Sequence, residues 1–334
     1  MSSESLEQTF NVVSPARLKL SNIRGSVDIL PGEPGILTVT ATKYSEYGDV
    51  SRTQIAMSQS ADGLVTVETR YQDAWWGFFS FSKPCKVDYQ VHIPPTCEVD
   101  ASCVSSSLAV RGLDGKFKLS TVSGEMRLEN LSGEIKLSGV SGETGGSGLA
   151  GALHLNTVSG EVRLVDSALT SSDLTTVSGE IRLQTTLTEG PYRFHSVSGS
   201  VWLSVPADTR CSLELQSISG GVHVNLPVTR QKIGGRHYSY DVQGGGVRVT
   251  ANSVSGGLYV ESSSGTSQES IPTDTVEDDE LSFTELPPLP PQPPVPPLPA
   301  QPPEPVLDRA VILDRIEKGE MSVEDGLKAL EKLA

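Results

Sequence analysis

The sequence predicts an all-β protein built as a β-solenoid, or β-helix, of short strands, with a disordered linker and a small helical hairpin after it. Three observations predict this: a glycine-centred unit recurs through the middle of the chain, apolar residues alternate with polar ones around each glycine, and the C-terminal part turns acidic and proline-rich. Glycine is abundant (32 residues) and aromatic residues make up only 5%. Few bulky side chains suit a thin, regular β architecture.

The repeat is clearest in three eight-residue units. Residues 121–128 read TVSGEMRL, residues 157–164 read TVSGEVRL, and residues 176–183 read TVSGEIRL. Related units follow, and weaker copies lie midway, so that the glycines from Gly115 to Gly160 fall nine residues apart. Strong copies recur every 18–21 residues. This spacing predicts a coil with two short strands and two turns per rung.

Alternation along a strand predicts which side chains face inward. Residues two before, two after and four after most of these glycines are apolar, as at Val122, Met126 and Leu128 around Gly124. We therefore expect all three columns to form the interior. We expect the glycine itself to take a positive φ or a bulged conformation at the corner.

The remaining columns face outward and form a candidate surface strip. Glutamates follow the glycines and basic residues lie two positions further on, whereas the later copies carry aromatic side chains and histidine instead. A solvated face that keeps the register is one interpretation, and a binding strip is the other; capping would also explain the aromatic end. The strip comprises Glu125, Arg127, Glu161, Arg163, Glu180, Arg182, Trp202, His223 and Tyr259.

The first hundred residues are less regular. Residues 1–7 are expected to be disordered, 8–102 to form capping strands and hairpins, and 103–261 to form the rungs of a solenoid that spans 8–261. Five aromatic residues cluster in one loop, which either folds back as a plug or contacts a membrane or a partner. They are Trp75, Trp76, Phe78, Phe79 and Phe81.

Residues 262–305 are expected to be a linker, acidic and disordered at first and then proline-rich, with 12 prolines between Pro287 and Pro305. Residues 306–334 carry two apolar stripes separated by Gly319, which predicts two short helices. Because two such short helices bury little surface by themselves, this tail should self-associate or dock on a protein partner. Its candidate assembly residues are Leu307, Val311, Ile316, Leu327 and Leu330.

Composition narrows the functional classes. The net charge is −15, with no clustered basic face, which argues against nucleic-acid binding. The four cysteines are too few for a disulfide framework. The chain shows neither a signal peptide nor a long apolar span, which predicts a cytoplasmic protein with peripheral membrane contact left open. No pattern indicates catalytic residues, a metal site or a cofactor.

The TVSGE-type repeats, together with VDYQVHIPP at Val87–Pro95, resemble the bacterial putative-adhesin family of β-strand repeats, a domain of unknown function. The segment ILDRIEKGEMSVEDGLKAL at Ile312–Leu330 is similar to SHOCT-like helical segments. The resemblance implies association with membranes or the cell envelope and oligomerisation through the tail.

Three functions are weighed from the sequence. The first is a non-enzymatic binding or envelope-associated sensing module with tail-mediated assembly, motivated by the aromatic loop and the tethered helices. The second is a structural or adhesive scaffold that assembles end to end or laterally. A carbohydrate-active β-helix enzyme is the third, and it would need an acidic cluster without basic partners.

Overall fold

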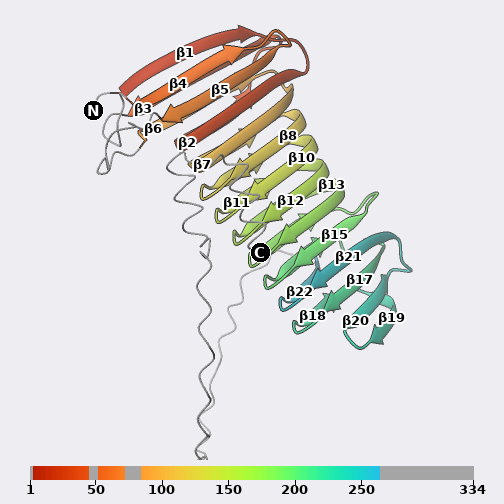
Figure 1. Ribbon diagram of the computed structural model, residues 1–334. Helices are drawn as coiled ribbons and strands as arrows, with labels where there is room; N and C mark the ends of the chain where they lie inside the picture. Colours follow the sequence, from red (N-terminus) through yellow and green to blue (C-terminus); the bar gives the residue numbers. More distant parts are fainter. Residues whose placement is uncertain (1–2, 45–51, 72–83, 264–334) are drawn as a thin grey trace, which may run out of the picture.

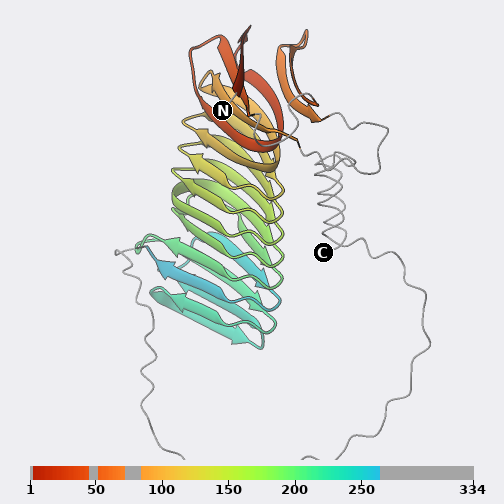
Figure 2. The same ribbon diagram turned by 90° about the vertical axis from the view of Figure 1, so that its left-hand side faces the viewer.

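The computed structural model describes residues 3–44, 52–71 and 84–263, which form strands β1–β22 and contain no helix. The strands stack into two facing layers, sheet I and sheet II, with the core between them (Figures 1 and 2). The long strands β2, β7 and β13 bend at a corner and contribute to both layers. The described residues therefore form a β-solenoid.

Both sheets run from the N-terminal end of the solenoid to its C-terminal end, and their strands follow one another in space in this order. Sheet I contains β4 (Thr53–Gln59), β5 (Leu64–Tyr71), β2 (Ala16–Pro31), β7 (Thr96–Arg111), β8 (Asp114–Thr121), β10 (Ser132–Gly139), β12 (Ala150–Thr157), β13 (Val162–Thr176), β15 (Tyr192–Ser196), β21 (Val247–Ser253), β17 (Cys211–Ser217), β20 (His237–Val242) and β19 (Val228–Gly234). Sheet II contains β1 (Ser3–Asn11), β3 (Ile36–Tyr44), β6 (Lys86–Ile93), β2, β7, β9 (Met126–Glu129), β11 (Thr144–Ser147), β13, β14 (Ile181–Thr185), β16 (Val201–Val205), β22 (Leu258–Ser262) and β18 (Val222–Asn225).

The register confirms two strands per rung. Gly115 of β8 lies opposite Gly133 of β10, which lies opposite Gly151 of β12, so consecutive rungs are offset by 18 residues. The offset grows further along, because Ile181 of β14 pairs with Val201 of β16. All these rung-to-rung pairings are parallel. The nine-residue period is thus half a rung.

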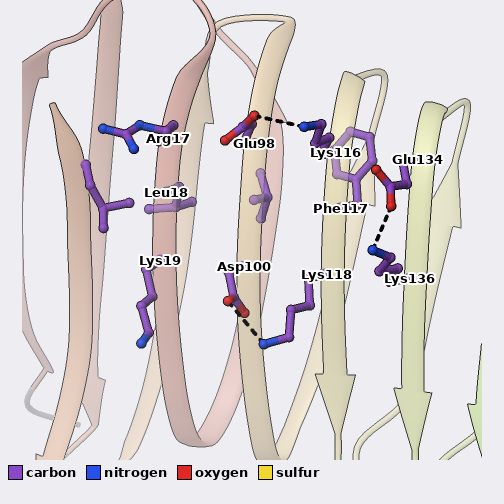
Figure 3. Close-up of a pocket in the computed structure, with 12 residues that line it drawn as sticks. Arg17, Leu18, Lys19, Glu98, Asp100, Lys116, Phe117, Lys118, Glu134 and Lys136 are labelled. Carbon is purple, nitrogen blue, oxygen red and sulfur yellow. Dashed lines mark hydrogen bonds and ion pairs between the residues drawn. The ribbon is translucent and has the colours of Figure 1, made fainter. Parts of the chain in front are cut away.

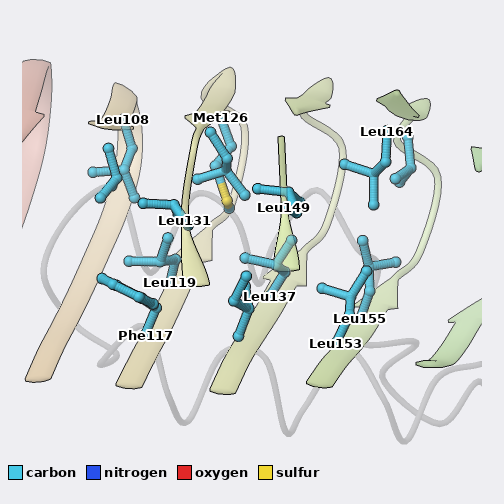
Figure 4. Packing of buried hydrophobic residues seen from close by; sticks show 14 of the residues in the cluster. Leu108, Phe117, Leu119, Met126, Leu131, Leu137, Leu149, Leu153, Leu155 and Leu164 are labelled. Carbon is cyan, nitrogen blue, oxygen red and sulfur yellow. The ribbon is translucent and has the colours of Figure 1, made fainter. Parts of the chain in front are cut away.

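Apolar side chains from the two sheets interdigitate as layers in the core (Figure 4). Residues two and four after the glycines are buried from Phe117 to Leu203, as predicted, and only at β18 are Val222 and Val224 half-exposed. The residues two before the glycines behave differently at the two corners. Leu113, Leu131 and Leu149 belong to the hydrophobic core cluster, whereas Val122 and Val140 are buried but lie outside it.

The prediction that the whole column is interior is therefore wrong for its C-terminal members. Val197, Ile218 and Val254 of that column are 45–47% exposed and point outward. The physical reason lies in the turn. In the V-S-G corner, the residue before the valine turns its hydroxyl toward the glycine, and Thr121 Oγ1 accepts a hydrogen bond from Gly124 N at 3.0 Å. With Thr121 buried at the corner, the next side chain faces outward.

The prediction that the repeat glycines take a positive φ holds at only one of the two corners of each rung. Gly115, Gly133 and Gly151 have positive φ. The glycines of the V-S-G corner do not, and they are required for another reason: a Cβ on Gly160 would lie 2.0 Å from the carbonyl oxygen of Gly142 in the neighbouring rung. Close approach of backbones, rather than backbone conformation, selects glycine there.

The N-terminal end is capped by strands that reverse direction. β4 is antiparallel to β5, and β3 is antiparallel to β6. The expectation of disorder over residues 1–7 is corrected from residue 3 onward, because β1 pairs with β3 through backbone hydrogen bonds along its length. Although only Phe10 of β1 is buried, the ladder itself orders this strand.

The C-terminal end departs from the order of the sequence. The last rung, β21 and β22, lies between the rung of β15 and β16 and the rung of β17 and β18 (Figure 1, blue between green and blue-green). The intervening β19 and β20 form a hairpin that pairs with β17 and extends sheet I. Sheet II ends at β18 within the described part of the chain.

Candidate functional site

The predicted surface strip lies on the outer face of sheet II. Arg163 of β13 is the register partner of Arg182 of β14, and Arg127 is linked to Arg163 through Gly145 of β11. Glu125 Oε1 lies 2.6 Å from Arg127 Nε, and the same distance separates Glu180 Oε1 from Arg182 Nε. The structure therefore brings the strip together, and Glu125 and Glu180 each pair with the arginine two residues further along the chain. Exposed pairs of this kind contribute about 0–1 kcal/mol each.

The strip ends in a stack of rings. The Arg182 guanidinium lies 5.7 Å from the centroid of the Trp202 ring. Trp202 stacks on Tyr259 at 3.8 Å with an interplanar angle of 6°, and Tyr259 stacks on His223 at 5.1 Å and 8°. Tyr259 stands between the other two rings because its rung is inserted between theirs. Sequence order alone places His223 next to Trp202, so this order was not predictable.

Glycines make room for these rings. Gly257 stands two residues before Tyr259 and Gly221 two before His223, where the earlier rungs carry glutamate. A Cβ on Gly257 would lie 2.5 Å from the Tyr259 ring, and one on Gly221 would lie 2.8 Å from His223 Nε2. Since the ring faces cover one another, the stack presents ring edges, with the indole N–H and the phenol hydroxyl as hydrogen-bonding groups. The loss of the glutamates thus turns a charged strip into an aromatic one.

A second surface feature lies on the outer face of sheet I and was missed from the sequence. A shallow hollow of about 350 Å³ spans β2, β7, β8 and β10 (Figure 3). The Lys136 ammonium beside Glu134 lowers the pKa of that carboxyl below its ordinary value. Three ion pairs border the hollow: Lys116 with Glu98 at 3.7 Å, Lys118 with Asp100 at 3.5 Å, and Lys136 with Glu134 at 2.6 Å. The alternation of bases and acids at the 18-residue spacing was the signal available in the sequence.

The four cysteines are buried free thiols. Burial raises the pKa of Cys97 and of Cys103 to about 12 and that of Cys211 to about 11. Thiols with such pKa values are protonated at neutral pH and are poor nucleophiles. Over the described ranges, no group of three histidine, cysteine or carboxylate side chains is placed to hold a metal ion.

Two sets of sequence-predicted residues lie outside the described residues. They are the aromatic cluster Trp75, Trp76, Phe78, Phe79 and Phe81, and the tail residues Leu307, Val311, Ile316, Leu327 and Leu330. No helix within 3–44, 52–71 or 84–263 is long and apolar enough to cross a membrane.

Fold and surface together define a repeat-built β-solenoid with a regular outer strip. Residues 16–261 match the family described as Toastrack DUF4097, and the chain belongs to that family. This confirms the resemblance of the repeats to a β-repeat family of unknown function; the SHOCT-like resemblance of the tail lies beyond the match. No curated protein matches the chain.

Two solved structures are similar to this chain at low identity. One is titled a "putative cell adhesion protein" from Clostridium sporogenes, with 13% identity and a TM-score of 0.26, covering 78% of this chain and 100% of that one. The other is titled a "putative lipid binding protein" from Parabacteroides distasonis, with 11% identity and a TM-score of 0.38, covering 77% and 96%. These values are too low to transfer either description.

Proposed function

We propose that the protein is a non-enzymatic binding module of the cell envelope that contacts its partner through the aromatic end of the strip. One observation carries the proposal. The outward charges of sheet II pair with one another at Glu125–Arg127 and Glu180–Arg182, whereas beyond Arg182 the columns hold stacked rings flanked by glycine. A rigid backbone with pre-ordered aromatic side chains loses little conformational entropy on binding.

The paired carboxylates also argue against the carbohydrate-active enzyme. Glycoside hydrolases use two carboxyl groups that flank the substrate, one of them held protonated. Glu125 and Glu180 instead each form an ion pair with an arginine, so these carboxylates have basic partners. The tail is proposed to add assembly, or docking on a protein partner, to the binding surface.

The test is sedimentation of the full chain with isolated cell-wall sacculi and with vesicles of phosphatidylglycerol and phosphatidylethanolamine. Trp202→Ala removes the ring at the Arg182 end of the stack, and Lys136→Ala on sheet I is the matched control. The proposal expects binding to one of these envelope materials, weakened at least tenfold by Trp202→Ala and unchanged by Lys136→Ala. Wild-type protein that stays in the supernatant with both materials would sink the proposal.

A second function, the adhesive scaffold, is favoured by the ends of sheet II. β1 runs parallel to β6 because both are antiparallel to β3, so β1 and β18 both run in the direction of the rungs. Head-to-tail stacking would therefore continue the sheet. Multi-angle light scattering separates the two functions. Assembly that survives removal of residues 264–334 favours the scaffold, and a truncated monomer favours the binding module.

A further inference from the structure

The outward valines of the V-S-G corners form one apolar column along the solenoid, which we call the valine ridge. The backbone fixes their order, since Ser123 N donates to Val104 O at 2.9 Å and the same bond links each later corner to the rung before it. Consecutive members are therefore about 4.8 Å apart. In spatial order the ridge comprises Val104, Val122, Val140, Val158, Val177, Val197, Val254 and Ile218.

The ridge is apolar and its polar neighbours are already satisfied. The serine after each valine donates its hydroxyl hydrogen to the valine carbonyl of the preceding rung, as Ser141 Oγ does to Val122 O at 3.2 Å. Ser198 and Ser255 make the same bond, to Val177 and Val197, at the other end of the ridge. A covering segment would therefore bury methyl groups without leaving these hydroxyls unpaired.

Exposure along the ridge is uneven. Val122 is 1% exposed and Val140 is 0% exposed, although neither belongs to the core cluster. Val197 is 47% exposed, and it too has a valine on both sides, Val177 and Val254. Because stacked neighbours are the same at both places, the rungs do not account for the difference. Low exposure therefore sets the N-terminal part of the ridge apart from its C-terminal end.

The C-terminal segment 306–334 fits the N-terminal part of the ridge. Its sequence predicts two short helices whose apolar residues recur every three or four positions, as Leu307 and Val311 or Leu327 and Leu330 do. A helix rises about 5.4 Å per turn, close to the rung spacing of about 4.8 Å, so successive turns can lie against successive valines. A helix of about 13 residues is about 20 Å long and covers four rungs.

The linker is also long enough to bring the tail to the N-terminal part of the ridge. It leaves the described solenoid at Ser263, after β22, and four rung steps, about 19 Å, separate that rung from the rung of Val140. Residues 264–305 provide the connection, and a chain spans up to about 3.3 Å per residue. The same connection raises the local concentration of the tail at the ridge to the millimolar range.

We propose that residues 306–334 dock in cis on the valine ridge at Val104, Val122 and Val140. This deepens the proposed function, because it names where the tethered tail rests. A tail held there can be released to a partner, or exchanged with a second copy, only by a competitor that binds more strongly than the intramolecular contact. The exposed end of the ridge at Val197, Val254 and Ile218 remains uncovered in this arrangement.

The test is tryptic release of the tail from the full chain, followed by intact mass. Trypsin reports on the tail alone at this end, because residues 262–308 contain no basic residue while the tail holds Arg309, Arg315, Lys318, Lys328 and Lys332. The proposal expects cleavage at least tenfold slower than in a free 306–334 peptide, at a rate that does not change on dilution. Val122→Asp with Val140→Asp should abolish the protection, and Val197→Asp with Val254→Asp should leave it intact.

Two further variants keep the result decisive. Should the ridge variant unfold by circular dichroism, Val122→Ser with Val140→Ser replaces it, and Leu327→Asp with Leu330→Asp tests the tail without touching the solenoid. Docking in cis would be overturned by any of three results: cleavage as fast as in the free peptide, protection that survives in a folded ridge variant, or protection that falls on dilution. Sedimentation with sacculi or vesicles is read separately, so its failure would reject the binding module and leave this result standing.

Discussion

Replacing Gly160 by alanine should separate two rungs of the solenoid. A Cβ at this position would lie 2.0 Å from the Gly142 carbonyl oxygen, whereas real Cβ atoms essentially never approach within 3.0 Å, so the backbones must part by at least 1.0 Å. Three rung-to-rung hydrogen bonds lie at this corner, with lengths of 2.8–3.1 Å: Ser159 N to Val140 O, Val158 N to Gly139 O, and Thr144 N to Glu161 O.

The expected cost follows from those bonds. Lengthened by 1 Å they leave hydrogen-bonding range, and each contributes about 0.5–1.5 kcal/mol net. We therefore expect Gly160→Ala to lower the free energy of unfolding by about 2–4 kcal/mol. Relaxation by a side-chain rotation is not available, because the atom that would be struck belongs to the backbone. In a stacked array this weakens the coupling between neighbouring rungs rather than one local contact.

Gly145 provides the matched control. It lies in the neighbouring rung, that of Gly142, in β11; its φ is not positive, and a Cβ there would meet nothing within 4 Å. Gly145→Ala should therefore stay within about 0.5 kcal/mol of wild type or be slightly stabilising. Urea unfolding followed by circular dichroism measures both. Equal effects of the two substitutions would refute the reasoning, because they would show that glycine content rather than backbone approach sets the cost.

Three further outcomes are expected. Trp202→Ala should lower the free energy of unfolding, measured in urea, by about 2 kcal/mol, because it removes the stack with Tyr259 and the contact with Arg182. A change below about 0.5 kcal/mol would show that the rings do not stabilise one another. An aromatic disulfide reagent at pH 8 should label no cysteine in the native protein and all four in urea, since the thiols are buried; prompt native labelling would contradict this. Burial raises the pKa of Tyr89 from 10.0 to about 12 and that of Cys103 from 9.0 to about 12. Both groups hold their protons more tightly when folded, so stability is full below pH 9 and falls as pH rises toward 12, with a smaller fall in Tyr89→Phe; a flat profile would refute it.

Much of the solenoid could be predicted because its rule is local. The positions of Met126 and Leu128 relative to Gly124 decide which side chains face the core, and the same offsets recur in most rungs. The distinction between Leu131, which is in the core, and Val140, which is not, could not be predicted from spacing. Both stand two residues before a glycine, and only the conformation of the two corners separates them.

The strip shows the same division. That Trp202, Tyr259 and His223 share a face followed from their positions relative to the glycines, and the structure brings them together. Their order along the stack depends on the pairing of β22 with both β16 and β18, a long-range choice that leaves no local trace. The hollow of sheet I likewise depends on how the outer side chains of β2, β7 and β8 lean, which spacing does not determine.

The inserted rung also constrains how the chain can fold. Within the stack of rungs, residues 211–225 take their place against residues 247–262, so a growing chain cannot complete its C-terminal rungs in the order of synthesis. Until the final segment emerges, the edges of β15 and β16 have no neighbour to pair with, and β17 and β18 cannot join the stack. Closure of the array is therefore a late, long-range event, slow relative to the local stacking of the middle rungs. Its completion depends on the last strand before Ser263, so a chain that ends before β22 lacks the piece that joins the terminal rungs to the rest.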